Sequence, residues 1–154
     1  MNILFVCSGN ISRSFLAEVL LEHEINQLDL DDISVSSAGL FALPGNPADP
    51  GMVEYLLKLG IPVKSHRARQ ITVQDVRWAD LILVMEKAHG SMIKQTWPEA
   101  KTKVGLLGKF ISNSQNQDNV VDPFGRTPYH YRLAQSQITL AVNGLVKKLV
   151  SKKN

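Results

Sequence analysis

The chain has 154 residues, of which 44% are hydrophobic and 20% are charged, and its formal net charge is +3. This length and composition are in the usual range for one compact soluble domain with a hydrophobic core, here residues 1–154, so we expect one active site and no division of labour between domains. The longest apolar run, Leu81 to Met85, is far shorter than the roughly 20 residues of a membrane span. No signal-peptide pattern precedes the first apolar run. We therefore expect no membrane insertion and a cytoplasmic protein.

The visible cluster of basic residues lies near the end of the chain. It consists of Lys147, Lys148, Lys152 and Lys153. Cations are favoured at the end of a helix by the helix dipole. No aromatic residues interleave these lysines, as they do in surfaces that bind nucleic acids. We expect a solvated helix end and no nucleic-acid partner.

Hydrophobic periodicity predicts strands and helices in alternation. In chain order, the expected elements are a strand at 2–6, a helix at 14–27, a strand at 33–36, a helix at 52–59, a strand at 80–84, a helix at 86–96, a strand at 103–106 and a helix at 129–150. A polar loop at 112–119 precedes the last helix. This alternation predicts an α/β fold of three layers, with a four-stranded parallel sheet and helices on both faces.

Ligands of such folds bind beyond the carboxyl ends of the strands, so the loop from Cys7 to Ser14 is the first candidate site. Cys7 is the only cysteine. It can form neither an internal disulfide nor a cysteine-rich metal site, so it is either an inert core residue or a reactive thiol. The loop joins a strand to a helix, and its backbone N–H groups can converge on one anion. The partial positive charge of these N–H groups also stabilises a thiolate, which makes Cys7 a candidate nucleophile.

Five residues separate Cys7 from Arg13, a spacing that lets the loop curl around an anion. Arginine gives a phosphate two parallel hydrogen bonds, which lysine cannot imitate. Gly9 permits close approach of the backbone, and Asn10 tolerates a left-handed conformation. Ser14 can donate a hydrogen bond to the sulfur. The predicted substrate-binding residues of this loop are Ser8, Gly9, Asn10, Ile11, Ser12 and Ser14.

These residues resemble the loop of the low-molecular-weight protein tyrosine phosphatases, which reads Cys-x-Gly-Asn-x-Cys-Arg-Ser. The segments Leu83 to Lys87 and Val104 to Gly108 resemble the bacterial members of this family. The resemblance covers nearly the whole chain. Further family-like segments are Ala17-Glu18, Ser37-Ala38-Gly39, Gly60-Ile61, His66-x-Ala68-Arg69, Asp80 to Met85 and Asp122-Pro123-Phe124-Gly125. The resemblance implies a flavodoxin-like, phosphotyrosine phosphatase I-like fold. It also implies hydrolysis of phosphotyrosine through a phosphocysteine intermediate, without a cofactor.

Such a reaction needs a general acid that protonates the departing phenolate and then activates water. The resemblance gives this role to the aspartate of the Asp-Pro pair, here Asp122. Pro123 holds the residue before it in an extended conformation. Asp75 and Asp118 lack such support. The predicted catalytic residues are Cys7, Arg13 and Asp122.

Apolar side chains are expected to wall the substrate pocket. Phe124 takes the place where the family usually has an aromatic residue that packs on the substrate ring. Ile11 is expected on the opposite side, with Leu40, Phe41 or Leu43. A deep apolar slot admits a phenyl phosphate, whereas phosphoserine is too short to reach the thiolate. In relatives that act on phosphoarginine the position of Ile11 is usually threonine, so isoleucine favours tyrosine.

His66 resembles a family histidine that orients the loop asparagine, here Asn10, together with Ser37. We expect these residues to support the loop. The other histidines share no metal-ligand spacing with one another or with Cys7. We therefore predict no metal and no cofactor. These other histidines are His23, His89 and His130.

Two loop positions depart from the family pattern. Ser12 replaces the second cysteine, and Phe15 replaces the proline that usually opens the helix. The second cysteine of relatives can trap an oxidised nucleophile as a disulfide. This chain has no other thiol to do so, and we expect peroxide to drive Cys7 past sulfenic acid.

The alternatives are a phosphoarginine phosphatase, an arsenate reductase-like protein, a phosphocysteine carrier and an inactive phosphotyrosine-binding module. An arsenate reductase needs further cysteines, and Arg13 with Asp122 argues against a carrier, which must preserve its phosphocysteine. The expected partner is a tyrosine-phosphorylated protein. The bacterial resemblance suggests an autophosphorylated tyrosine kinase that controls exopolysaccharide or capsule export. We expect a monomer or a weak dimer.

Overall fold

The computed structural model describes residues 1–111 and 119–154. Its sheet has four parallel strands in the order β2-β1-β3-β4. The strands are β1 (Asn2–Cys7), β2 (Ser34–Gly39), β3 (Leu81–Val84) and β4 (Val104–Leu106). The predicted three-layer α/β architecture is confirmed. Of the predicted polar loop, only Asn119 is among the described residues, and Asp118 lies outside them.

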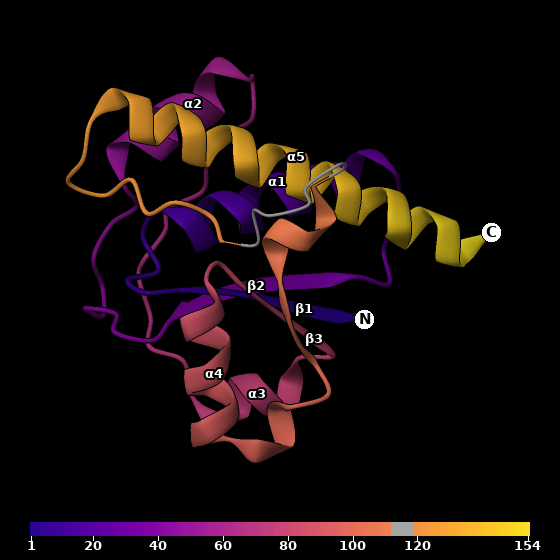
Figure 1. Ribbon diagram of the computed structural model, residues 1–154. Helices are drawn as coiled ribbons and strands as arrows, with labels where there is room; N and C mark the ends of the chain where they lie inside the picture. The colour runs from indigo at the N-terminus through magenta and orange to yellow at the C-terminus, as the bar shows by residue number, and fades with distance from the viewer. Residues whose placement is uncertain (112–118) are drawn as a thin grey trace.

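Helices cover both faces of the sheet (Figure 1). Three of them, α1 (Arg13–Gln27), α2 (Pro50–Lys58) and α5 (Pro128–Lys153), lie on one side, and α3 (Val73–Trp78) and α4 (Lys87–Thr96) lie on the other. Short 3₁₀ turns, η1 (Pro98–Ala100) and η2 (Leu107–Phe110), flank β4. In the part of the chain that is described, no helix is both long enough and apolar enough to cross a bilayer.

The sequence analysis missed α3 and made β2 too short. Helix α3 has six residues, which is too few for a helical period to stand out. Its signal is the capping box, in which Thr72 and Asp75 bond each other's backbone N–H groups. Strand β2 runs to Gly39 because its polar serines pair with β1 in register. Pairing with a neighbouring strand here outweighs low strand propensity.

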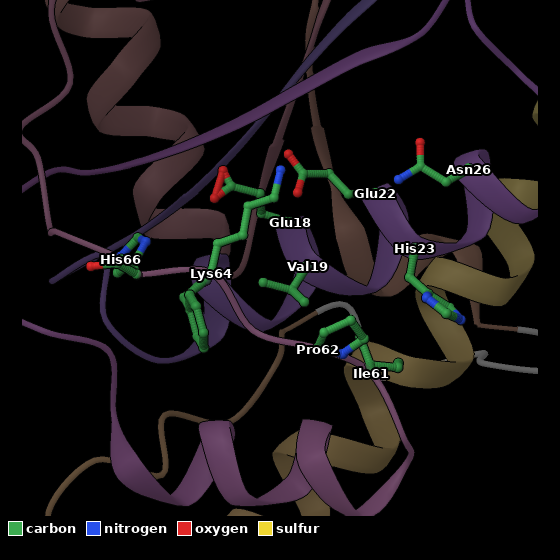
Figure 2. Close-up of a pocket in the computed structure, with 11 residues that line it drawn as sticks. Glu18, Val19, Glu22, His23, Asn26, Ile61, Pro62, Lys64 and His66 are labelled. Carbon is green, nitrogen blue, oxygen red and sulfur yellow. The ribbon is translucent and has the colours of Figure 1, made fainter.

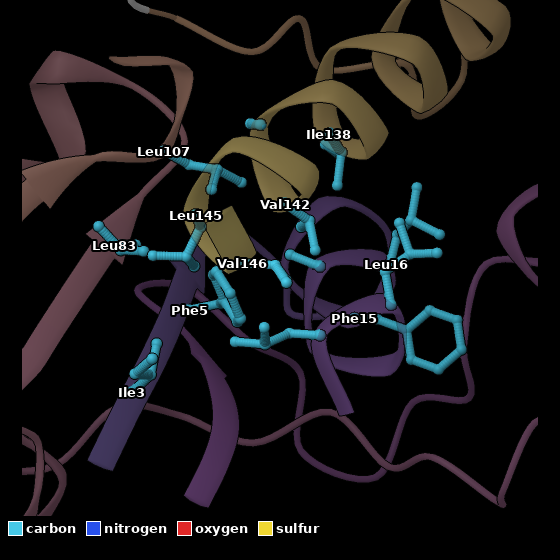
Figure 3. Close-up of a cluster of buried hydrophobic side chains, with 14 of the residues drawn as sticks. Ile3, Phe5, Phe15, Leu16, Leu83, Leu107, Ile138, Val142, Leu145 and Val146 are labelled. Atoms are coloured by element: carbon cyan, nitrogen blue, oxygen red, sulfur yellow. The ribbon is translucent and has the colours of Figure 1, made fainter. Parts of the chain in front are cut away.

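Strand β1 is apolar without interruption, and both of its faces are buried. Ile3 and Phe5 point toward α1 and α5, where they pack with Phe15, Leu16 and Leu145 (Figure 3). The opposite cluster, toward α3 and α4, includes Leu4, Val6, Val76, Ile82 and Ile93. The central strand is thereby fixed from both sides, and so is the loop that follows it.

The end of β1 is a topological switch point, because its neighbours β2 and β3 lie on opposite sides of it. Cys7 ends β1 and lies opposite Gly39, the last residue of β2. A Cβ atom on Gly39 would lie 2.7 Å from the backbone oxygen of Ser8 and 3.0 Å from the nitrogen of Asn10. Glycine at this position therefore lets the loop after β1 approach the end of β2.

Candidate active site

Asn10 holds the loop between β1 and α1 in its curled shape. Its φ angle is +58°, and its side chain is fully buried. The Nδ2 group donates to Ser14 Oγ and to Ser37 Oγ, both at 2.9 Å, and Oδ1 accepts from the backbone N–H of Arg69 at 3.0 Å. Helix α1, strand β2 and the segment before α3 that contains Arg69 thus fix the shape of the loop through one side chain.

Cys7 lies at the floor of the loop and is 3% exposed. Its Sγ lies 3.0 Å from Ser14 Oγ. Because Asn10 donates to the same hydroxyl oxygen, the hydroxyl hydrogen of Ser14 is free to point at the sulfur. The predicted contact between Ser14 and the sulfur of Cys7 is therefore present, and it is suited to a thiolate.

Arg13 begins α1 and is 2% exposed. Its NH1 group donates to Glu86 Oε2 at 2.8 Å and to the carbonyl oxygen of Val120 at 2.9 Å. Its NH2 group lies 3.5 Å from Asp122 Oδ2. Glu86 was not foreseen as part of the site. Its signal is its place two residues after the carboxyl end of β3, the strand beside β1.

Asp122 lies beside Arg13 with half of its side chain exposed to solvent. Its Oδ1 accepts a hydrogen bond from the backbone N–H of Phe124 at 3.2 Å, and Pro123 between them is buried. Asp75, by contrast, is bonded to Arg69 at 2.7 Å. Burial would raise the pKa of Asp75, but its bonds to Arg69 and Thr72 outweigh that effect and lower the pKa.

A cleft of about 290 Å³ opens above Cys7 and contains Arg13 and Asp122 in its lining. The predicted apolar residue Phe124 lines it on the outside, together with Ile11, Phe41 and Leu43. Leu40 does not line it. That residue is buried in the core toward α3 and α4, because it continues the pairing of β2 through a hydrogen bond to the backbone of Cys7. The remaining lining residues are Ser8, Gly9, Ser12 and Asn46.

His66 contacts the backbone of Asn10 rather than its side chain, with Nε2 2.6 Å from the carbonyl oxygen. Its ring lies 4.8 Å from that of Phe15, the residue that stands in place of the family proline. Ser37, the other predicted supporting residue, accepts from Asn10 and donates to Glu18 Oε1 at 3.1 Å. Both residues therefore contact Asn10, His66 at its backbone and Ser37 at its side chain.

Glu18 accepts from Ser37 and lines a second cavity of about 280 Å³ beside α1, which shares no lining residue with the cleft. Figure 2 shows Glu18 and Glu22 on one side of this cavity, with Lys64 extending toward them and His66 at one end. Burial raises the pKa of Glu18 to about 7, with a contribution from Glu22. Sequence reasoning noted Glu18 only as part of the family pattern.

His89 lies in the first turn of α4 and contacts the loop after β1. It is 6% exposed, and its Nε2 lies 3.1 Å from Ser8 Oγ and 3.5 Å from Glu86 Oε2. Burial and the charge of Arg13 lower the pKa of His89, against the opposing effects of Glu86 and Asp122. Sequence analysis considered this histidine only as a metal ligand.

Ser12 is the N-cap of α1, yet its side chain makes no capping hydrogen bond. It is 4% exposed, and its Oγ has no hydrogen-bond partner among the described residues. Ile11 is tied down through its backbone, because its carbonyl oxygen accepts from the N–H of Asp49 at 2.8 Å. Asp49 in turn caps α2 and accepts from Tyr131 at 2.8 Å.

The described residues contain no group of three or more His, Cys, Asp or Glu side chains that could hold a metal ion.

Comparison with known proteins gives a consistent family match. A family model described as low molecular weight phosphotyrosine protein phosphatase matches residues 2–154. The protein-arginine-phosphatase of Geobacillus stearothermophilus is 36% identical over 147 residues, which cover 96% of this chain and 95% of that protein. The probable low molecular weight protein-tyrosine-phosphatase EpsP of Ralstonia nicotianae is 37% identical over 147 residues, which cover 96% and 94%.

Solved structures agree with the sequence matches. The YwlE arginine phosphatase from Geobacillus stearothermophilus superposes with a TM-score of 0.87 at 35% identity, covering 99% of this chain and 94% of that one. YfkJ from Bacillus subtilis superposes with a TM-score of 0.90 at 26% identity, covering 100% and 97%. Proteins named for two substrates, phosphotyrosine and phosphoarginine, are thus similar to this chain.

Proposed function

The chain belongs to the low molecular weight phosphotyrosine protein phosphatase family, whose members are cysteine-dependent phosphatases, and from that premise we propose that it hydrolyses phosphotyrosine in proteins. The observation that carries the proposal is the cleft in which Cys7, Arg13 and Asp122 meet between apolar walls. Cys7 is the nucleophile, Arg13 binds the phosphoryl group, and Asp122 is the general acid and base.

In the first step, the thiolate of Cys7 attacks phosphorus and the bond from phosphorus to the phenolic oxygen breaks. The phenolate takes the proton of Asp122, and a phosphocysteine remains. In the second step, the carboxylate of Asp122 takes a proton from water, whose oxygen attacks the same phosphorus. The bond from sulfur to phosphorus breaks, the thiolate returns, and inorganic phosphate leaves.

The buried side of the site supports both steps. Ser14 donates to the sulfur at 3.0 Å and stabilises the thiolate as attacking and as leaving group. Glu86 and the carbonyl of Val120 hold Arg13 through NH1. The NH2 group, which faces Asp122 in the cleft, is left to bind phosphate oxygens.

The cleft walls favour phosphotyrosine over phosphoarginine. Four of the lining residues are apolar: Ile11, Phe41, Leu43 and Phe124. The ring of tyrosine carries no hydrogen-bond donor, so these walls can bury it without loss. The guanidinium of phosphoarginine keeps N–H donors, which apolar walls leave unpaired. Because arginine phosphatases are among the similar proteins, phosphoarginine is the second candidate substrate.

Matched peptides that carry phosphotyrosine or phosphoarginine at the same position test this choice. We expect kcat/KM for phosphotyrosine to exceed that for phosphoarginine by at least about tenfold, and Ile11→Thr to narrow the ratio, since a hydroxyl can accept from the guanidinium. Leu57→Thr, in an exposed part of α2, is the control. A wild-type preference for phosphoarginine would overturn the assignment. A single stoichiometric burst with p-nitrophenyl phosphate would instead indicate a carrier or an inactive module.

The physiological partner that we propose is a tyrosine-phosphorylated protein, with an autophosphorylated tyrosine kinase of exopolysaccharide or capsule export as the specific candidate. Similarity to protein-tyrosine-phosphatases such as EpsP supports it. A pull-down with Cys7→Ser, which binds substrate without turning it over, tests it. The kinase should be retained by this variant and released by added tungstate, and recovery of other phosphoproteins in its place would refute the specific candidate.

A further inference from the structure

His89 is a buried, titratable residue that the mechanism above does not use. Its position in the first turn of α4 brings its ring beneath the loop, 3.1 Å from Ser8 Oγ. An apolar side chain would fill the same space without burying a polar ring. The other ring nitrogen, Nδ1, is buried and has no hydrogen-bond partner among the described residues. A specific contact made by Nε2 is therefore the feature that distinguishes histidine here from a simple packing residue.

The surroundings of His89 fix the position of its proton. The ring is neutral near pH 7, because burial and Arg13 lower its pKa. A neutral imidazole has one N–H group. On Nδ1 that hydrogen would be a buried donor without an acceptor, whereas on Nε2 it is directed at Ser8 Oγ. Glu86 Oε2, at 3.5 Å, favours the same tautomer by its negative charge.

The hydroxyl of Ser8 is then oriented by His89. Its oxygen accepts from the ring, so its hydrogen points elsewhere. No other side-chain hydrogen bond of Ser8 is made with the described residues. Ser8 follows Cys7 directly and lines the cleft with Cys7 and Arg13. An oxyanion bound above the thiol is the acceptor that the hydroxyl hydrogen lacks.

We propose that His89 is a positioning residue that holds the Ser8 hydroxyl as a hydrogen-bond donor to the phosphoryl group. The inference rests on the proposed function, since it names a further donor of the same site. It also distinguishes two roles at the start of α4: Glu86, its N-cap, holds Arg13 directly, and His89, in its first turn, acts through Ser8. Because the donor is set before substrate arrives, it contributes to binding of any tetrahedral oxyanion, with or without turnover.

Two substitutions of similar shape separate positioning from packing. His89→Gln places an amide N–H near the position of Nε2, whereas His89→Asn places it near that of Nδ1. We expect His89→Asn and Ser8→Ala each to weaken tungstate binding in calorimetry by about tenfold and to lower kcat/KM by a similar factor. His89→Gln should stay within about threefold of wild type. His23→Asn, in α1 beside the second cavity and not in the lining of the cleft, controls for loss of an imidazole.

The double variant Ser8→Ala/His89→Asn should be no worse than either single variant, because both changes remove the same donor. Fully additive losses would overturn the proposed route through Ser8. Equal losses for His89→Gln and His89→Asn, or no loss for either, would overturn the positioning role. Thermal unfolding identifies a variant that fails to fold, and the Ser8→Ala variant still tests the donor. Calorimetry needs no turnover, so an inactive wild-type protein would refute the proposed function alone.

Discussion

The two sides of the active site differ in how firmly they are held. On the loop side, Asn10, Ser12, Arg13 and Ser14 are each at most 4% exposed. Bonds from β2 and Arg69 fix Asn10, and a bond from Glu86 fixes Arg13. On the other side, Asp122 is half exposed. It is held by the N–H of Phe124 and by the ion pair with Arg13 at 3.5 Å. The proposed phosphate-binding loop is therefore organised in advance, whereas the proposed general acid, Asp122, can adjust to the leaving group.

The largest effect is expected from a substitution on the loop side that abolishes turnover and preserves oxyanion binding. Cys7→Ser removes the nucleophile, because an alcohol beside the same donors remains protonated. We expect turnover of p-nitrophenyl phosphate to fall by at least about 10⁴-fold. Tungstate binding should stay within about threefold of wild type, since Asn10 and Arg13, not the thiol, hold the loop. Loss of tungstate binding in a folded variant would show that the sulfur itself shapes the loop.

A smaller effect on kcat, which depends on the leaving group of the substrate, is expected from substitution of Asp122. Asp122→Ala removes the proton donor, so kcat for phenyl phosphate should fall by about 10²-fold to 10³-fold. The loss should be smaller for p-nitrophenyl phosphate, whose phenolate leaves without a proton. Rapid quenching should recover some phosphocysteine, because water is no longer activated. The control is Asp31→Ala, in the exposed turn before β2.

Equal losses for the two leaving groups would contradict the role of Asp122 as acid. An Asp122→Ala enzyme as fast as wild type would refute its assignment altogether. Asp122→Asn refines the comparison, because it keeps an acceptor for the N–H of Phe124 and still cannot transfer the proton. Its kcat should match that of Asp122→Ala, and a much faster variant would mean that the side chain positions the segment instead.

Site residues that lie together in the sequence could be predicted, whereas site residues that depend on contacts between distant segments could not. The loop from Cys7 to Ser14 is contiguous, and an apolar strand precedes it, so its place and chemistry could be predicted from the residues. Glu86 and His89 could not be assigned, because their contacts depend on β3 being the neighbour of β1. Periodicity identifies a buried strand but does not say which strand lies beside it.

The apolar wall shows the same limit at the scale of one residue. Leu40 was one of three candidates, but only Phe41 and Leu43 line the cleft. The pairing of β2 continues past Gly39 far enough to bury Leu40. Successive side chains then point in opposite directions. An error of a few residues in the end of a strand is thus enough to place the wrong side chain in a pocket.

A substitution at Gly39 tests how tightly the loop after β1 packs against the end of β2. Gly39→Ala would put a methyl group 2.7 Å from the backbone oxygen of Ser8, and the loop would have to move. We expect a loss of about 1–3 kcal/mol in the free energy of unfolding and weaker tungstate binding. Gly105→Ala is the control, because the added methyl meets Leu83 at an ordinary 3.7 Å. Unchanged tungstate binding by Gly39→Ala would mean that the loop tolerates a shift.

The smallest expected effect is the contribution of Glu18 to the pH dependence of the free energy of unfolding. The pKa of Glu18 is raised from 4.5 to about 7. The unfolded chain therefore loses this proton first as pH rises, and stability is lost between those two values and stays constant above them. A pKa difference of one corresponds to about 1.4 kcal/mol, which sets an upper limit of about 3 kcal/mol. Solvent in the second cavity reduces the expected loss to about 1–2 kcal/mol.

Glu18→Gln removes the ionisation and keeps an oxygen that accepts from Ser37. We therefore expect it to raise the free energy of unfolding at pH 8 by about 1–2 kcal/mol and to leave it nearly unchanged at pH 4. Urea unfolding at both pH values measures the difference, with Glu24→Gln on the same helix as the control. A gain of equal size at both pH values would mean that the charge of Glu18 is not its cause. Because Ser37 binds Asn10, a stabilised variant that keeps its tungstate affinity would show that the loop is already fully held.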